Sequence, residues 1–100
     1  MHGDLVVDLA AHQARFRERP VRLRANEFRL LVHFLEHRDQ VLSRARLIAG
    51  VGKAGEAIQE RTADVWAGRL RRALRSAGAP DPLRTVRNIG YVMDSCQEAR

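Results

Sequence analysis

The stretch "RTADVWAGRLRRALR", residues 61–75, constrains the fold most, because it reads as an amphipathic helix with two very different faces. At 100° per residue, Ala63, Ala67, Leu70 and Leu74 fall on one line, which predicts a stripe that packs on a core. The opposite side gathers basic and polar residues with one apolar residue among them: Arg61, Thr62, Val65, Arg69 and Arg72. A glycine, Gly68, and a tryptophan at the border of the two faces, Trp66, complete the stretch.

The charge on this helix is not the mixture of signs that usually keeps a helix soluble. Asp64 is the single acid among five arginines, so pairing within the helix does not explain the pattern, although acids from elsewhere in the chain could. Residues 61–87 carry a net charge of +5, while the other 73 residues carry +1. Such a focused positive field suits nucleic acid or an acidic membrane surface. Because arginine matches phosphate oxygens and the guanine edge, the pattern favours the major groove of DNA.

The length of 100 residues allows one domain with a single modest core. No apolar run approaches the roughly 18 residues of a membrane span, and the first residues lack the pattern of a signal peptide. Cys96 is the one cysteine, so neither a disulfide framework nor a cysteine-based zinc site is available. We therefore expect a cytoplasmic protein that does not act on a membrane.

Two patterns that suggest chemistry fail on closer reading. In the glycine-containing segment from Gly50 to Glu60, Lys53 is followed by Ala54 instead of the Ser or Thr that a phosphate-binding loop needs. His33 and His37 have the i, i+4 spacing of two zinc ligands, but no HExxH pattern or third ligand accompanies them, and we expect both to be solvated. The sequence predicts no catalytic residue, no cofactor and no metal, and therefore no enzyme.

Before the arginine helix, the pattern predicts strands and then two helices. "DLVVDLA", "QARFR" and "VRLR" alternate as short antiparallel strands do, with Pro20 at the bend between the last two. "NEFRLLVHFLEH" repeats its apolar residues at helical spacing, with Asn26 near its start. A second helix is expected to begin at Ser43, a good N-cap, and to stop at Gly50.

The arginine helix is expected to run from Arg61 to Ala77 and to be closed by Gly78. "LRTV" and "YVM" then predict a hairpin, in which Asn88 and Gly90 tolerate the left-handed backbone of a tight turn. Arg87 lies at this turn, where a long side chain could reach a minor groove. The hydroxyls of Thr85 and Tyr91 could bind phosphates, and Tyr91 could equally be a core residue.

In this order and spacing, "NEFRLLVHFLEH", "VLSRARLI", "ERTADVWAGRLRRAL" and "LRTVRNIGY" resemble the C-terminal effector domain of OmpR/PhoB-type response regulators. The resemblance implies an α+β winged helix-turn-helix, with an N-terminal antiparallel sheet, a three-helix core and a C-terminal β-hairpin wing. It covers one domain over residues 1–95, which leaves 96–100 as a disordered tail and leaves no room for a receiver domain. The family usually opens its first helix with Thr-Pro-Thr-Glu, whereas this chain has Arg24 to Glu27, so the capping box is lost or replaced by Asn26.

The resemblance also implies a function, which is sequence-specific binding of double-stranded DNA by a transcription regulator. The residues expected at bases are Val65, Arg69 and Arg87, and those expected at phosphates are Arg61, Thr62, Trp66, Arg71, Arg72, Thr85 and Tyr91. The loop from Gly50 to Glu60 would meet RNA polymerase, and the domain would be monomeric alone and bind DNA as a head-to-tail dimer. The alternative is a basic winged-helix module that binds protein, RNA or acidic surfaces without DNA sequence specificity.

Overall fold

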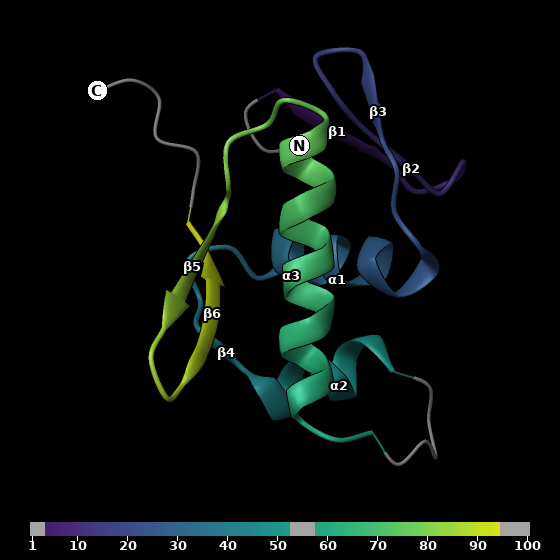
Figure 1. Ribbon diagram of the computed structural model, residues 1–100. Coiled ribbons are helices and arrows are strands. Elements are labelled where there is room, and N and C mark those ends of the chain that lie inside the picture. The colour runs from purple at the N-terminus through teal and green to yellow at the C-terminus, as the bar shows by residue number, and fades with distance from the viewer. Residues whose placement is uncertain (1–3, 53–57, 95–100) are drawn as a thin grey trace.

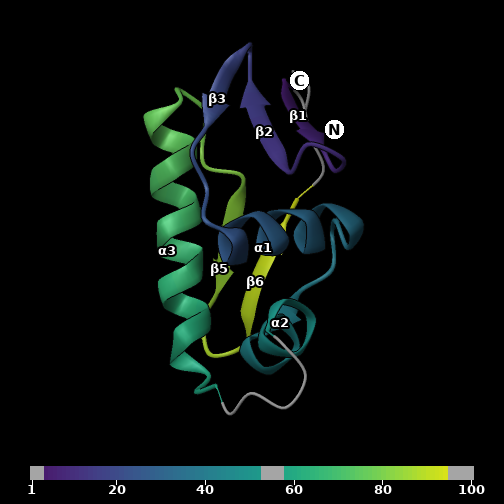
Figure 2. The same ribbon diagram turned by 90° about the vertical axis from the view of Figure 1, so that its right-hand side faces the viewer.

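The computed structural model describes residues 4–52 and 58–94, which form two small antiparallel sheets around three helices (Figure 1). The elements in chain order are β1 (Leu5–Asp8), β2 (Gln13–Phe16), β3 (Arg19–Val21), α1 (Ala25–Glu36), β4 (Leu42–Ser43), α2 (Arg44–Val51), α3 (Arg61–Ser76), β5 (Leu83–Val86) and β6 (Gly90–Met93). Figure 2 shows the β1–β2–β3 sheet above α1, α2 below it, and α3 along one side. The expected α+β architecture is confirmed, whereas the expected tail at 96–100 lies outside the described residues.

No helix in the described parts of the chain is long and apolar enough to cross a membrane. The core is one cluster to which every helix contributes, and its largest fully buried side chains include Phe34, Leu47 and Leu70.

The N-terminal sheet differs from the sequence prediction at its second turn. The chain reverses at Arg17 and Glu18, whose φ angles are 49° and 72°, so the bend lies before Pro20 and not at it. Pro20 instead pairs with Arg15 inside β3, which is an edge strand, where the missing N–H of proline is tolerated. Residues 22–24, expected to belong to this strand, form a linker that leads to α1.

The start of α1 also differs from the expectation. Asn26 does not cap the helix, because its Oδ1 accepts a hydrogen bond from Arg29 at 2.9 Å. Helix α1 begins at Ala25 with Arg24 as N-cap, and Arg24 has no acceptor for the free N–H groups of the first turn. Glu27, which is 3% exposed, accepts the backbone N–H of Arg24 at 3.2 Å. One half of the usual capping box therefore survives and the other is lost.

At the start of α2 the expected cap is confirmed, since Ser43 Oγ accepts the backbone N–H of Arg46 at 3.1 Å. The helix runs one residue past Gly50, to Val51. Strand β4, in which Leu42 pairs with Tyr91 and Ser43 with Gly90, was not predicted from the sequence. This short strand ties α2 to the C-terminal hairpin.

The apolar stripe of α3 is confirmed, because Ala63, Ala67, Leu70 and Leu74 are all at most 1% exposed. Helix α3 ends at Ser76 with Ala77 as its C-cap, and Gly78, the next residue, takes a φ of 90°, as a glycine after a helix C-terminus does.

The hairpin β5–β6, which we call the wing, turns at Asn88 with a φ of 64°, as predicted. Gly90 was expected for the same reason, but its φ is not in the left-handed region. Its role is a close approach of two backbones, because a Cβ at this position would lie 2.0 Å from the carbonyl oxygen of Leu42.

We predict that Gly90→Ala lowers the free energy of unfolding by about 2–3 kcal/mol, because β4 and β6 must separate to admit the methyl group. The matched control is Gly68→Ala, since a Cβ there meets no atom within 4 Å. Alanine is the better helix former, so this variant should gain about 1 kcal/mol. Urea unfolding of both proteins measures the difference, and equal midpoints would contradict the close approach.

Candidate nucleic-acid interface

The outward face of α3 exposes the basic residues that the sequence predicted. Arg61, Arg69 and Arg72 are exposed, and Val65 is 49% exposed among them. Within the described residues, these three arginines and Arg87 at the tip of the wing form no ion pair. Their guanidinium groups are therefore free to bind an anion, while the exposed valine offers an apolar surface between them.

Arg71 has a different role from the other arginines of α3. Its Nε lies 3.1 Å from Asp81, and its Nη2 donates to the carbonyl oxygen of Leu83 at 3.0 Å and to Thr85 Oγ1 at 3.1 Å. The guanidinium thereby fastens α3 to β5. The predicted phosphate ligands Arg71 and Thr85 are thus already bound to each other, although the Thr85 hydroxyl keeps a proton to donate.

Tyr91 and Trp66, which were also predicted to contact phosphates, belong to the core at 6% and 5% exposure. The hydroxyl of Tyr91 donates to Oδ1 of Asp64, and the Nε of Arg44 donates to the same carboxylate at 2.9 Å. Burial raises the pKa of Asp64, but the hydrogen bonds from Tyr91 and Arg44 outweigh burial and hold this pKa below its usual value. The lone acid of the arginine helix thus joins α3 to α2 and to β6.

Arg44 and Asp81 also belong to this arrangement and were not predicted from the sequence. The available signal was the small number of acids on this helix, because Asp64 alone cannot pair with five arginines and acids from elsewhere, such as Asp81, could. No local pattern in the sequence predicts that Asp64 is also bound by a tyrosine, Tyr91, 27 residues away.

We predict that Tyr91→Phe lowers the free energy of unfolding by about 1 kcal/mol, because Asp64 loses a donor while the ring stays packed. Asp64→Asn should cost a comparable amount. In a double-mutant cycle measured by urea unfolding, the two changes should couple by at least about 0.5 kcal/mol, since they act on one hydrogen bond. Additive effects would contradict the network.

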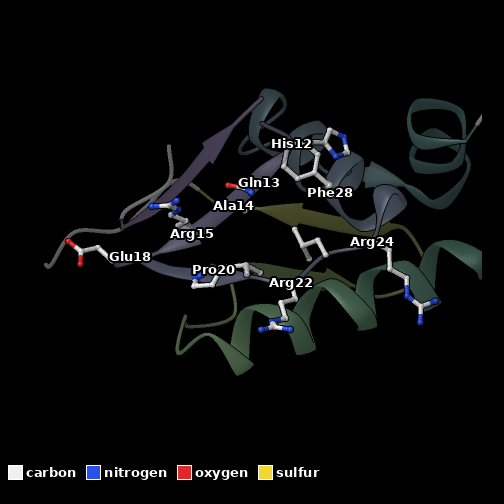
Figure 3. A pocket seen from close by; sticks show the side chains of 11 residues that line it. His12, Gln13, Ala14, Arg15, Glu18, Pro20, Arg22, Arg24 and Phe28 are labelled. Carbon is white, nitrogen blue, oxygen red and sulfur yellow. The ribbon is translucent and has the colours of Figure 1, made fainter. Parts of the chain in front are cut away.

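Two hollows flank the linker at residues 22–24. One, of about 430 Å³, lies between the linker and α3 and is lined by Arg22, Arg24, Arg69, Arg72 and Ser76, among others. The other, of about 760 Å³, lies between the linker and the N-terminal sheet, and Figure 3 shows Arg15, Glu18 and His12 among its lining residues. The first hollow joins the linker to the predicted binding face of α3.

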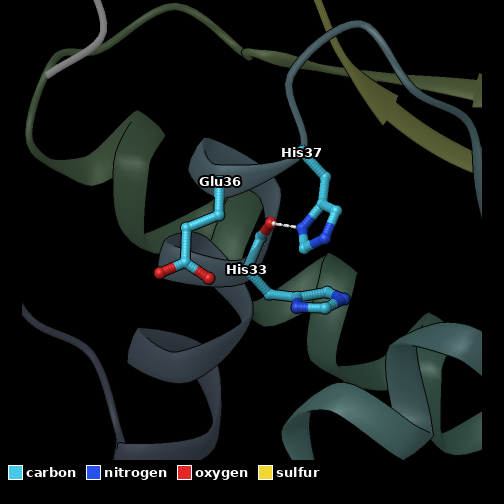
Figure 4. Close-up of side chains that lie close together, drawn as sticks. All are labelled: His33, Glu36 and His37. Carbon is cyan, nitrogen blue, oxygen red and sulfur yellow. Dashed lines mark hydrogen bonds between the residues drawn. The ribbon is translucent and has the colours of Figure 1, made fainter.

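The histidine pair on α1 is less solvated than expected. The ring of His33 packs on the backbone of Gly50, where a Cβ would lie 2.5 Å from its Cε1, and its Nε2 is buried without a partner. His37 Nδ1 is 2.8 Å from the carbonyl oxygen of His33 (Figure 4). No third ligand was expected from the sequence, but Glu36 lies beside the two histidines, and the ligand atoms of the three residues are within 4.8 Å of one another. These three residues are where the described part of the chain could hold a metal ion.

His33 makes the stability depend on pH. Burial lowers its pKa below 6.5, His37 and Arg46 lower it further, and Glu36 opposes them. The unfolded chain therefore takes up this proton at a higher pH than the folded domain does. The contribution of neutral His33 is present above about pH 6.5 and is lost as the pH falls from there toward the folded pKa.

We predict that the free energy of unfolding falls as the pH drops below about 6.5, and that His33→Gln flattens this part of the profile. His12→Gln is the control, because His12 is exposed in the turn between β1 and β2, where its ring contacts Phe28 and not the His33 cluster. Urea unfolding across this pH range measures both, and an unchanged slope in His33→Gln would overturn the assignment.

Three helices, a sheet before them and a hairpin after them, with a basic third helix exposed beside the hairpin, define a winged helix-turn-helix domain. Residues 18–93 match the family described as "Transcriptional regulatory protein, C terminal", and the chain belongs to this family. The resemblance to effector domains of the OmpR/PhoB type is thereby confirmed. Because the family consists of regulatory domains, the expectation that the chain is not an enzyme is confirmed as well.

Transcription regulators of other bacteria support the family assignment. The chain is 43% identical over 93 residues to the phosphate regulon transcriptional regulatory protein PhoB of Rhizobium meliloti, covering 93% of this chain and 41% of that protein. It is 39% identical over 90 residues to the two-component response regulator PhoP of Pseudomonas aeruginosa, covering 90% of this chain and 40% of that protein. The chain therefore spans about two fifths of the length of these relatives.

Solved structures share the fold. The DNA-binding domain of CpxR from Escherichia coli superposes with a TM-score of 0.79 at 31% identity, covering 97% of this chain and 96% of that one. The RstA DNA-binding domain of Klebsiella pneumoniae, solved in complex with the RstA box, gives 0.78 at 29% identity, with 94% of both chains covered.

Proposed function

We propose that this chain binds double-stranded DNA sequence-specifically as the effector domain of a transcription regulator. In this proposal α3 lies in the major groove and Arg87 enters the adjacent minor groove. The observation that carries it is the division among the arginines. Arg44 and Arg71 join separate elements of the fold through ion pairs, and Arg84 pairs with Asp94 within the wing, whereas the arginines on the outward face of α3 and at the wing tip have no ion pair within the described residues. The complex of the RstA domain with the RstA box supports the same function in a relative of this fold.

The contacts of each residue refine its proposed role. We assign the bases to Val65, Arg69 and Arg87, and the phosphates to Arg61, Thr62 and Arg72. The other four predicted phosphate ligands, Trp66, Arg71, Thr85 and Tyr91, already pack or bond within the domain. We propose that they act mainly by holding α3 and the wing in place, and that Thr85 also donates its free hydroxyl proton to a phosphate.

The remaining proposals concern the whole protein. Because the named relatives are more than twice as long as this chain, we propose that the domain works with a receiver domain and acts in the cytoplasm. We also propose that it is a monomer alone and binds DNA as head-to-tail pairs. The loop from Gly50 to Glu60 is proposed to meet RNA polymerase, and residues 53–57 of it lie outside the described residues.

Binding to RNA is the less favoured alternative. Recognition of single-stranded RNA relies on exposed aromatic rings on which bases stack. All five Phe, Trp and Tyr residues of the chain are at most 9% exposed, so the domain offers no such platform.

The test begins with selection of bound duplexes from a pool of random DNA, which reports specificity, half-site spacing and orientation together. On the selected duplex, Arg69→Ala should cost about 1–3 kcal/mol of binding free energy and relax the preference at one base position. Arg15→Ala, an exposed change on the N-terminal sheet, is the control and should leave the preference intact. Equal weakening of all sequences by Arg69→Ala would show that this residue does not read a base, and the absence of any selected sequence would overturn sequence-specific binding.

A further inference from the structure

The linker at residues 22–24 runs beside α3 on the side opposite to the wing. Figure 1 shows the wing on one side of α3 and the chain leading from β3 to α1 on the other, and Figure 2, seen from the linker side, agrees. Arg22 and Arg24, on this linker, are both exposed. In Figure 3 both side chains extend from the linker on the side where α3 lies. The helix is therefore flanked by basic side chains on both sides.

Arg22 and Arg24 share a groove of about 430 Å³ with Arg69 and Arg72 of α3. None of the four forms an ion pair within the described residues. Glu27 is the acid in the lining of this groove, but it is 3% exposed and its Oε1 accepts the backbone N–H of Arg24. Four arginines thus line one groove without a matching exposed carboxylate, and two of them, Arg22 and Arg24, also line the hollow on the other side of the linker. Such an arrangement suits an external anion.

The geometry of duplex DNA indicates which anion this is. A helix in the major groove has a sugar-phosphate backbone on each side of it, about 12 Å apart across the groove. If α3 lies in the major groove, the wing is on the side of one backbone and the linker on the side of the other, because they flank α3 on opposite sides.

We propose that Arg22 and Arg24 bind phosphates of the DNA backbone that borders the major groove on the side away from the wing. This proposal rests on the proposed function, since it takes α3 to lie in the major groove. The two residues add affinity for any sequence, because phosphate contacts carry no base information. The domain then holds the duplex from both sides of α3.

The test is the salt dependence of DNA affinity in Arg22→Gln, Arg24→Gln and the double variant. Each lost phosphate contact should reduce the slope of log affinity against log salt concentration by about 0.9. The probes are the duplex recovered by selection and a duplex of unrelated sequence, and both affinities should fall by the same factor. Arg22→Lys and Arg24→Lys should keep most of the slope, because lysine retains the charge.

Arg15→Gln is the matched control, because Arg15 is exposed on β2, lines the other hollow and is absent from the lining of the groove beside α3. It should leave the slope unchanged. Thermal unfolding of every variant identifies any loss of affinity that comes from misfolding, and the lysine variants provide folded proteins if a glutamine variant unfolds.

Slopes of Arg22→Gln and Arg24→Gln that equal the wild-type slope would overturn the proposal. So would a loss confined to the selected sequence, which would indicate reading of bases. Failure of the proposed function gives a different result, since Arg69→Ala would then leave the sequence preference unchanged whatever the linker variants do. If the glutamine variants keep the wild-type salt slope for DNA but no longer bind an acidic peptide, the groove binds a protein partner and not the DNA backbone.

Discussion

The burial of one narrow stripe of α3 is the constraint on which the rest of the domain depends. Ala63 and Ala67 are small enough to bring the helix close to its neighbours, and Leu70 and Leu74 belong to the same core cluster as residues of α1 and of both sheets. Because this stripe occupies only part of the circumference, the opposite side never contacts the core. The arginines there repel one another, which lowers the stability of the domain, and the burial of the apolar side offsets this loss.

Arginine has two roles in this domain, and its partners distinguish them. Arg44 and Arg71 both lie over the Tyr91 ring, at 5.9 and 5.6 Å from its centre, and each binds an aspartate. They join helices to the wing, so removing either would change the position of the binding face. The unpaired arginines on the outward face of α3 do not join this helix to another element. A count of basic residues cannot separate these groups, whereas the location of each acid can.

The sequence predicted what depends on local periodicity or on local backbone chemistry. The stripe of α3, the Ser43 cap and the turn at Asn88 each follow from a few neighbouring residues, and all three are confirmed. Strand β4 could not be predicted, because two residues show no period and its pairing partner lies 49 residues away. The true role of Gly90 depends on the same distant contact. In the candidate interface, the exposed face of α3 could be predicted from its periodicity. The partners of Asp64 and the packing of His33 could not, because they depend on contacts between elements that are distant in the sequence.

The start of α1 shows why a local loss of stability can be informative. In the family pattern a threonine stands where this chain has Arg24, and a threonine hydroxyl caps a helix, which is worth about 1 kcal/mol. Arg24 cannot do so, and only the Glu27 half of the capping box remains. The stability of α1 therefore does not explain why an arginine stands at position 24. Its guanidinium, however, lines the groove beside Arg69 and Arg72, where a threonine would place no charge. An arginine at a capping position is therefore best explained by what it binds outside the domain, and the nearest large anion in the proposed complex is the DNA backbone.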